Sequence, residues 1–176
     1  SSFMISEIQG NIVDLLYAPL SAAEVTISIS LAAVTRSFMI AIISILTFYL
    51  IIDLEIKHFF MLVLFTFLSS FILGNIGIIA GLWAEKFDHM ATVTNFVIVP
   101  LSFLSGTFYT IDRLPKFLQT ISEANPFFYM IDGFRYSFIG VADGSIKTGI
   151  IYLCFLSFLT WLAAYLLFKK GYKIRS

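Results

Sequence analysis

The sequence predicts an all-α membrane protein, a polytopic bundle of transmembrane helices. Hydrophobic residues make up 59% of its 176 residues and charged residues only 12%, whereas a soluble domain averages about 45–50% and about 25%. Four apolar stretches are also long enough to cross a bilayer, which takes about 20 residues at about 1.5 Å each. We predict spans at residues 31–52, 59–84, 91–109 and 150–168.

The composition argues against several classes of function. The formal net charge is zero, so nothing indicates a nucleic-acid partner. Cys154 is the single cysteine, and His58 and His89 stand apart, so no metal site is predicted. The sequence has no G-x-x-x-x-G-K-[ST] phosphate loop, so this chain is not expected to be an ATP-hydrolysing enzyme. Its first residue is Ser rather than Met, which we interpret as a truncated start.

Basic residues near the span ends predict the orientation, because cytoplasmic loops carry an excess of Lys and Arg. The C-terminal tail KKGYKIRS is basic and has no acid, so we place the C-terminus in the cytoplasm. Four spans then put residues 1–30 in the cytoplasm as well and residues 111–147 outside. Arg36 lies near the inner end of the first predicted span, where its side chain is expected to reach the lipid headgroups.

A cytoplasmic segment precedes the first span. Ser21 and Glu24 fit a capping box, in which the Ser hydroxyl and the Glu carboxylate satisfy free N–H groups at a helix start. Pro19 cannot continue a preceding helix. The local pattern predicts a short helix at residues 12–17, a break, and a second helix that begins at Ala22 and runs into the membrane. An amphipathic linker on the cytoplasmic leaflet is an equally good interpretation.

Small residues and a proline predict how the spans pack and bend. The second span has Gly74, Gly77 and Gly81 at spacings of three and four residues, and small residues let helices approach closely. Pro100 in the third span removes a backbone hydrogen bond and is expected to kink that helix.

The segment NPFFYMIDGFRYSFIG, residues 125–140, is too short to span a bilayer and too apolar for an ordinary surface loop. Its initial Asn-Pro predicts a helix start, because Pro is tolerated in the first turn. Asp132 and Arg135 are three residues apart on that helix and can pair. With a preceding helical piece at residues 114–122, the pattern predicts short re-entrant or interfacial helices that cap the outer face. A loop that serves only as an interfacial anchor is the alternative.

Several short motifs follow one another along nearly the whole chain. They are Leu-Leu-x-x-Pro-Leu-Ser at residues 15–21, Pro100, Ser-Gly-Thr-Phe-Tyr at 105–109, Leu114-Pro115, Asn125-Pro126 and Gly133-Phe134-Arg135. Together they resemble the motifs of ABC-2 type permeases, the membrane subunits of a class of bacterial ABC exporters. Such permeases usually have six spans with both termini in the cytoplasm. The resemblance therefore implies that two further spans precede the four in this fragment.

The resemblance also implies a function and its partners. It predicts a multi-pass protein of the bacterial inner membrane that exports an amphiphilic drug, a lipid-linked saccharide or a polysaccharide by alternating access. A second permease copy, as a homodimer, and nucleotide-binding ATPase subunits are the expected partners, together with the surrounding membrane lipids. ATP and Mg²⁺ would bind to the ATPase subunits, and no cofactor is expected on this chain. The path would lie between the two permease copies, lined by the first and third spans.

Three groups of residues are the candidate functional positions on this interpretation. Those expected to couple the ATPase to the spans are Leu15, Leu16, Pro19, Leu20, Ser21 and Glu24. Those expected to form an outer gate or cap are Asn125, Pro126, Asp132, Gly133, Phe134 and Arg135. Those expected to bend and pack the spans are Gly74, Gly77, Gly81, Pro100 and Gly106.

Two other classes of protein stay open. A membrane-embedded enzyme acting on lipids would need a paired acid and base or a metal set, and Asp132 already has a predicted partner in Arg135. A non-transporting scaffold, or a channel, is the other class, although channels line their pores with rings of charge or carbonyls. A neighbouring reading frame that encodes a P-loop ATPase would favour the exporter.

Overall fold

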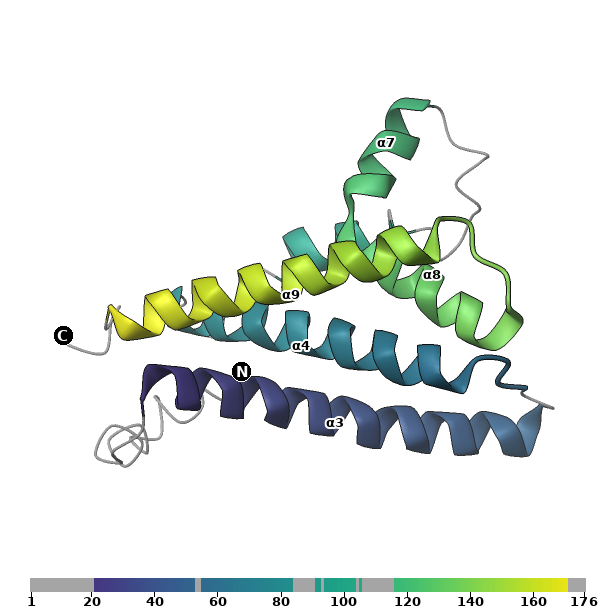
Figure 1. Ribbon diagram of the computed structural model, residues 1–176, viewed down its shortest axis with the longest axis horizontal. Coiled ribbons are helices and arrows are strands. Elements are labelled where there is room, and N and C mark those ends of the chain that lie inside the picture. The colour runs from purple at the N-terminus through teal and green to yellow at the C-terminus, as the bar shows by residue number, and fades with distance from the viewer. Residues whose placement is uncertain are drawn as a thin grey trace.

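The computed structural model describes residues 21–52, 55–83, 91–92, 94–103, 105 and 116–170, and every regular element among them is helical. Three long helices lie alongside one another, as Figure 1 shows. They are α3 (Ala22–Ile51), α4 (Phe59–Trp83) and α9 (Ile146–Lys169). In the described part of the chain, these three are long and apolar enough to cross a membrane.

The three long helices define two ends of the bundle. The proximal end is the end where α3 begins and α4 and α9 finish, and the distal end is the end where α3 finishes and α4 and α9 begin. α4 and α9 run in the same direction, and α3 runs opposite to both.

α3 begins with the predicted capping box, which is confirmed. The Glu24 carboxylate accepts a hydrogen bond from the Ser21 backbone N–H at 2.7 Å, and the Ser21 hydroxyl accepts one from the Glu24 N–H at 3.3 Å. From this cap the helix continues without interruption for 30 residues. At 1.5 Å per residue it is about 45 Å long, and it exceeds the roughly 30 Å hydrocarbon core of a bilayer.

α3 packs closely against α4 at Gly74. A Cβ added to Gly74 would lie 3.0 Å from the Ala33 Cβ, so the missing side chain sets the distance between the helices. Beside this contact, the buried Ser30 hydroxyl donates a 2.8 Å hydrogen bond to the Asn75 side-chain oxygen. A Cβ built at Gly77 would have no atom within 4 Å. Of these two glycines, only Gly74 therefore makes a close contact with another helix.

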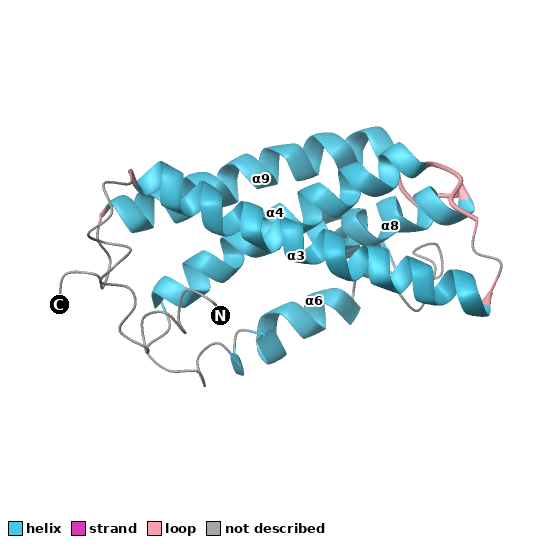
Figure 2. Cartoon of the chain, turned by 90° about the horizontal axis from the view of Figure 1, so that it is seen from below, coloured by secondary structure: helices cyan, strands magenta, loops and turns pink. Residues whose placement is uncertain are grey.

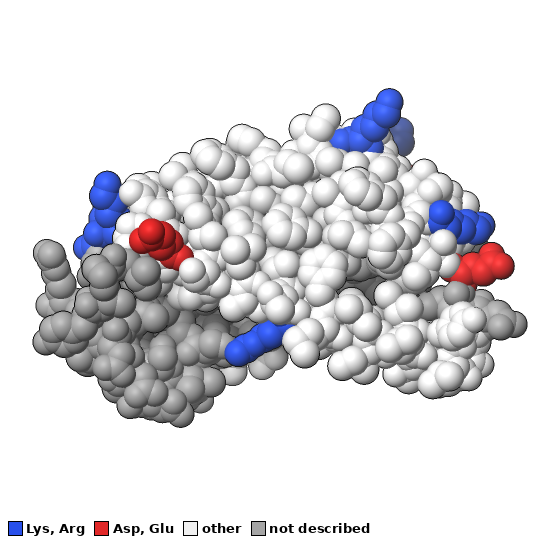
Figure 3. All heavy atoms as spheres, turned by 60° about the horizontal axis from the view of Figure 1, so that its bottom comes forward, with Lys and Arg blue, Asp and Glu red and all other residues white. Residues whose placement is uncertain are grey.

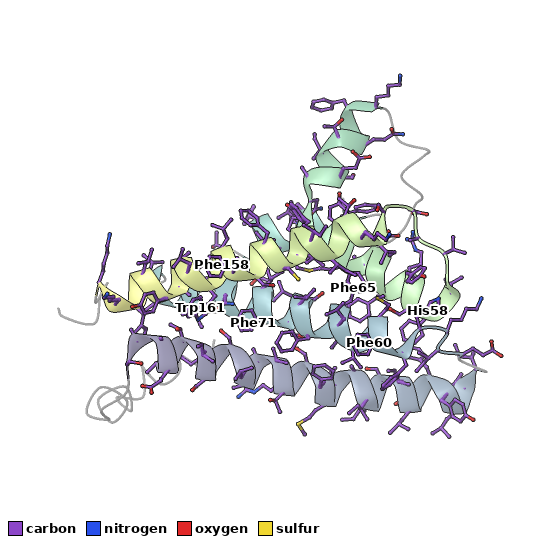
Figure 4. All side chains as sticks on the ribbon, viewed as in Figure 1. His58, Phe60, Phe65, Phe71, Phe158 and Trp161 are labelled. Atoms are coloured by element: carbon purple, nitrogen blue, oxygen red, sulfur yellow. The ribbon has the colours of Figure 1, made fainter. Side chains whose placement is uncertain are left out.

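α4 forms the centre of the bundle, because it packs on both other long helices and on α8 (Pro126–Ile139). Phe65, Leu68 and Ile72 of α4 make a buried cluster with Met130 of α8 and Leu153 of α9. Figure 4 shows Phe65 between the ribbons of α4 and α8. Nearer the proximal end, a second cluster joins α4 to α9, and its buried members are Ile78, Leu82 and Ala164.

The predicted third span is described only in part. A π-helical turn, η1 (Thr94–Ile98), leads into a short helix, α6 (Val99–Phe103), which contains Pro100. Pro has no N–H to donate, and a π-helical turn is one way in which a helix accommodates a break in its hydrogen-bond pattern. Residues 104 and 106–109, with Gly106, lie outside the described residues. Figure 2 shows α6 beside the three long helices.

Two short helices connect this region to α9. α7 (Lys116–Ala124) projects away from the bundle and contacts α8, as Figure 1 shows. α8 instead packs along α4 and α9 toward the distal end, where the chain turns back into α9. The helical character predicted for residues 114–122 and 125–140 is therefore found at residues 116–122 and 126–139, and Asn125 and Gly140 cap the second helix.

Candidate functional site

Asn125 holds the junction between α7 and α8. Its side-chain oxygen accepts a hydrogen bond from the Phe127 N–H at 3.0 Å, which caps α8, and Pro126 occupies the first turn. Its side-chain nitrogen donates to the Leu101 carbonyl of α6 at 2.7 Å. Asn125 is 3% exposed. The predicted helix start is therefore confirmed, and one amide side chain also joins α8 to α6.

A tyrosine of α9 holds the same junction from the other side. The Tyr152 hydroxyl donates a 2.8 Å hydrogen bond to the carbonyl of Ala124, the last residue of α7. The ring of Tyr152 also contacts the ring of Tyr129 on α8, with 5.1 Å between centroids.

Asp132 fixes the loop between α8 and α9. Its carboxylate is 2% exposed and accepts hydrogen bonds from the N–H groups of Asp143 at 2.8 Å and Gly144 at 2.9 Å. A buried carboxylate is costly unless such donors compensate it. The next residue, Ser145, caps α9 by accepting from the Thr148 N–H. Asp132 therefore sets where α9 begins relative to α8.

Arg135 makes two ion pairs, and the predicted one is the longer. Its guanidinium lies 3.9 Å from the Asp132 carboxylate, so the predicted pair is present. A shorter, hydrogen-bonded pair joins Arg135 to Asp143 in the loop. The closer contacts to the Asp132 carboxylate come from the backbone N–H groups of the loop, which were not predicted.

The turn between α3 and α4 is attached to the same part of α8. The His58 N–H donates a 3.0 Å hydrogen bond to the Ser137 carbonyl, and the His58 ring stacks on the Tyr136 ring with 4.6 Å between centroids. α8 ends at Gly140, whose φ of 80° is the left-handed conformation that glycine adopts readily. The α3–α4 turn, α8 and the α8–α9 loop thus meet at the distal end.

Gly133 allows α8 to lie directly on α4. A Cβ built at this position would be 2.2 Å from the Cδ1 atom of Phe65, a ring that is fully buried. Phe134, the next residue, lines an apolar cavity of about 420 Å³ at the distal end. The other walls come from α3 between residues 41 and 52, from Leu62 and from Phe138. Neither role was predicted, because both depend on contacts between distant segments.

Arg36 lies halfway along α3, not near an end. Fourteen residues separate it from Ala22 and fifteen from Ile51. The Ala33–Gly74 contact places Arg36 about level with residue 71, the middle of α4. The helix that contains Arg36 starts nine residues before the predicted span at residues 31–52. The predicted depth of Arg36 near the inner membrane surface stays a prediction. A charged side chain at the centre of a membrane helix costs about 2.5–3.5 kcal/mol on insertion scales.

The predicted coupling segment lies largely outside the described residues. Leu15, Leu16, Pro19 and Leu20 fall there, and only the Ser21–Glu24 cap is described. The described residues also contain no group of three or more His, Cys, Asp or Glu side chains that could hold a metal ion. What the arrangement can do is mechanical: it ties α8, the α8–α9 loop and the α3–α4 turn together.

Sequence reasoning missed Asp143, Tyr152 and the mid-helix position of Arg36. A signal existed for Asp143, because Asp-Gly-Ser directly before an apolar helix is typical of a turn and a cap. No local signal marks Tyr152 as a partner of residue 124, since 28 residues separate them.

The fold and these contacts define a class: an all-helical membrane protein whose long helices are braced at one end by a short helix. Comparison with known proteins identifies the family. The ABC-2 type transporter family matches residues 1–139 of the chain, and the chain belongs to that family. It is accordingly a multi-pass inner-membrane protein and a membrane transport subunit. No solved structure matches the chain.

Curated relatives agree with this assignment. The chain is similar to the inner membrane transport permease YadH of Escherichia coli (strain K12), with 30% identity over 178 residues that cover 100% of the chain and 69% of the relative. It is also similar to Nodulation protein J of Rhizobium leguminosarum bv. viciae, with 26% identity over 97 residues that cover 55% of the chain and 38% of that protein.

Proposed function

We propose that this chain is part of the permease subunit of an ATP-driven exporter that moves an amphiphilic molecule out of the cytoplasm by alternating access. The carrying observation is the family match over residues 1–139, which includes the segment before α3 and all of α4. The classes of molecule that we expect are drugs, lipid-linked saccharides and polysaccharides, because the apolar spans suit an amphiphile better than a small ion.

Energy would enter through a separate ATPase that binds ATP and Mg²⁺, and this chain would bind no cofactor. We expect the ATPase to dock on Leu15, Leu16, Pro19 and Leu20, because apolar residues on a cytoplasmic segment need a burial partner. The α3 cap supports this idea. Ser21 and Glu24 fasten the first turn of one uninterrupted helix, so a displacement at the proximal end would be carried along all of α3.

The proposed orientation puts the proximal end, and with it the C-terminus, in the cytoplasm. α7 and α8 would then enter the outer half of the bilayer as re-entrant helices and close the outer mouth. Asp132, Arg135 and their loop contacts would hold this cap in place. A second permease copy would complete a homodimer with the path between the copies, and membrane lipids would cover the remaining apolar surface.

The test is co-purification of the full-length protein with its candidate ATPase in mild detergent. The ATPase to use is the one encoded nearest to the gene of the permease. We expect two copies of each subunit per complex. The double substitution Leu16→Asp and Leu20→Asp should abolish the complex, because it places charge on the proposed docking surface. The matched control, Ser6→Asp with Gln9→Asp, adds the same charge to polar positions of the same segment and should leave the complex intact.

The opposite result would remove the main support for an exporter. A permease that purifies alone, with an ATPase whose activity is indifferent to it, would reopen two alternatives. These are a membrane-embedded enzyme acting on lipids and a non-transporting scaffold.

A further inference from the structure

Among the three long helices that the structure describes, Arg36 is the charged residue at mid-length. The sequence of α4 contains no charged residue, and the charged residues of α9 are Lys147 and Lys169, at its two ends. Figure 3 shows charged side chains at both ends of the molecule and a basic side chain midway along this face. The register with Gly74 places Arg36 at mid-length of α3 and α4 alike.

The depth of Arg36 separates it from the lipid phosphates. α4 spans 25 residues and α9 spans 24, so each is only a little longer than the hydrocarbon core. The hydrocarbon core of the bilayer must therefore be centred near the middle of α4 and α9. The middle of a core of about 30 Å lies about 15 Å from either surface, roughly twice the reach of an extended arginine side chain. Headgroups of the resting bilayer are thus out of reach.

The surroundings of Arg36 match an amphiphile with an anionic group. Arg36 is exposed on α3, and its neighbours on the same side, Met39, Ile40 and Ile43, are apolar and more than half exposed. The guanidinium has five N–H donors, so a hydrogen bond within the protein still leaves donors for a phosphate or carboxylate. A charged residue at this depth commonly marks the path of a transported molecule.

We propose that Arg36 binds the anionic group of the transported molecule halfway across the membrane, and that the substrate class is an anionic amphiphile. The guanidinium binds the phosphate or carboxylate, and the apolar tail lies along the exposed face of α3 beyond Arg36. This inference rests on the proposed function, because it requires that the chain transports a molecule.

The experiment compares three twelve-carbon amphiphiles on the full-length complex in phosphatidylcholine nanodiscs. Dodecyl phosphate carries an anionic group, dodecyl maltoside is neutral and dodecyltrimethylammonium is cationic. The readout is the concentration of each that half-maximally stimulates ATP hydrolysis. We expect dodecyl phosphate to act at the lowest concentration. Arg36→Gln should raise that concentration about tenfold, which is the loss of one charged hydrogen-bonding partner.

Two further variants serve as controls. Arg36→Lys keeps the charge and should respond to dodecyl phosphate nearly as the unmodified protein does. Phe155→Gln adds the same amide group to an exposed position of α9, where residue 155 is 63% exposed and outside the proposed binding face, and should also respond normally. All variants are expected to respond equally to dodecyl maltoside.

Thermal stability separates a binding role from a structural one. A residue kept for binding at a cost to the fold can be replaced without loss of stability, so Arg36→Gln should melt at the same temperature as the unmodified permease or higher. A lower Tm for Arg36→Gln that Arg36→Lys restores would show a structural ion pair instead and overturn the proposal. An unchanged response of Arg36→Gln to dodecyl phosphate would also overturn it.

The failure of this inference can be told apart from failure of the proposed function. If the complex with the ATPase forms and the three amphiphiles act alike, only the role of Arg36 is refuted. If no complex forms, the exporter itself is refuted. Binding of radiolabelled dodecyl phosphate to the permease alone in nanodiscs then still tests Arg36. Equal binding by the unmodified protein and Arg36→Gln would refute the site.

Discussion

The two ends of the bundle are held together by different kinds of contact. At the distal end, α8 is joined to its neighbours by directional polar contacts, which include the Asp132 hydrogen bonds, the Arg135–Asp143 pair and the His58–Tyr136 stack. Toward the proximal end, α4 and α9 meet through apolar side chains such as Ile78, Leu82 and Ala164, and the Ser30–Asn75 hydrogen bond is the polar link described there between α3 and α4.

This difference indicates where the helices of the bundle can move relative to one another. Hydrogen bonds and ion pairs require particular distances and angles, so the distal end should move as one body with α8. Apolar packing is non-directional and permits small sliding movements between helices. The proximal end is therefore the better place for movement, and it is also the end to which the proposed ATPase would bind.

The largest expected effect tests the contact that seats α8 on α4. Gly133→Ala would place a methyl group 2.2 Å from a carbon of the buried Phe65 ring. We expect the substitution to lower the free energy of unfolding by about 3 kcal/mol, at the upper end of overpacking costs. The measurement is thermal unfolding of the full-length permease in detergent.

Gly77→Ala is the matched control, because nothing lies within 4 Å of a Cβ at that position. It should leave Tm unchanged or raise it slightly, since Ala is the better helix former. Adding Phe65→Leu to Gly133→Ala removes the ring and should restore part of the loss. If Gly133→Ala has the same Tm as the unmodified protein, α8 does not pack on Phe65 as described.

A smaller effect is expected from removing the charge of Asp132. Asp132→Asn keeps the shape of the side chain but cannot accept from both the Asp143 and Gly144 N–H groups with equal strength. We expect a loss of about 2 kcal/mol, as for a hydrogen-bonded charged group. Hydrogen exchange should show faster opening of residues 141–145.

Asp143→Asn provides the comparison for that result. The Asp143 side chain is 18% exposed and that of Asp132 only 3%, so loss of the Arg135–Asp143 pair should cost less than loss of the Asp132 hydrogen bonds. If the two substitutions cost the same, the loop is held by the ion pair rather than by the Asp132 hydrogen bonds.

The smallest effect is expected at the proximal end, from the α3 cap. Ser21→Ala removes the hydroxyl that accepts from the Glu24 N–H, and should cost about 1 kcal/mol locally. Because the cap acts on the first turn of α3, we expect faster hydrogen exchange at residues 22–26 with little change in Tm. Ser21→Thr keeps the hydroxyl and should behave normally. A large fall in Tm with Ser21→Ala would show that the cap stabilises the whole bundle and not only the first turn of α3.

Local patterns accounted for the features that a few neighbouring residues decide. The Ser21–Glu24 box and the Asn-Pro start of α8 were predicted and are confirmed, because their partners lie within three residues. The predicted Asp132–Arg135 pair was found for the same reason, as both residues share one helix face. The main partner of Arg135 was missed, because Asp143 belongs to a loop whose path depends on where α9 docks.

Other features could not be found from local patterns. The Gly133–Phe65 contact joins residues 68 positions apart, and the link from Asn125 to Leu101 crosses 24. Gly74 and Gly77 looked alike in the sequence, yet only Gly74 meets another helix closely. The coupling roles of Leu15 and Leu16 and the gate role of the cap stay predictions.

The sequence by itself determined that this protein is a helical membrane protein, where α3 and α4 begin, and to which family its motifs point. These properties follow from apolar length, from capping chemistry and from residue spacing, all of which act within one helix. Only the tertiary structure decided that Asp132 organises a loop, that Gly133 seats a helix and that Arg36 lies level with the middle of α4. Each of these depends on the register between helices, which is set by side-chain packing across segments distant in the chain.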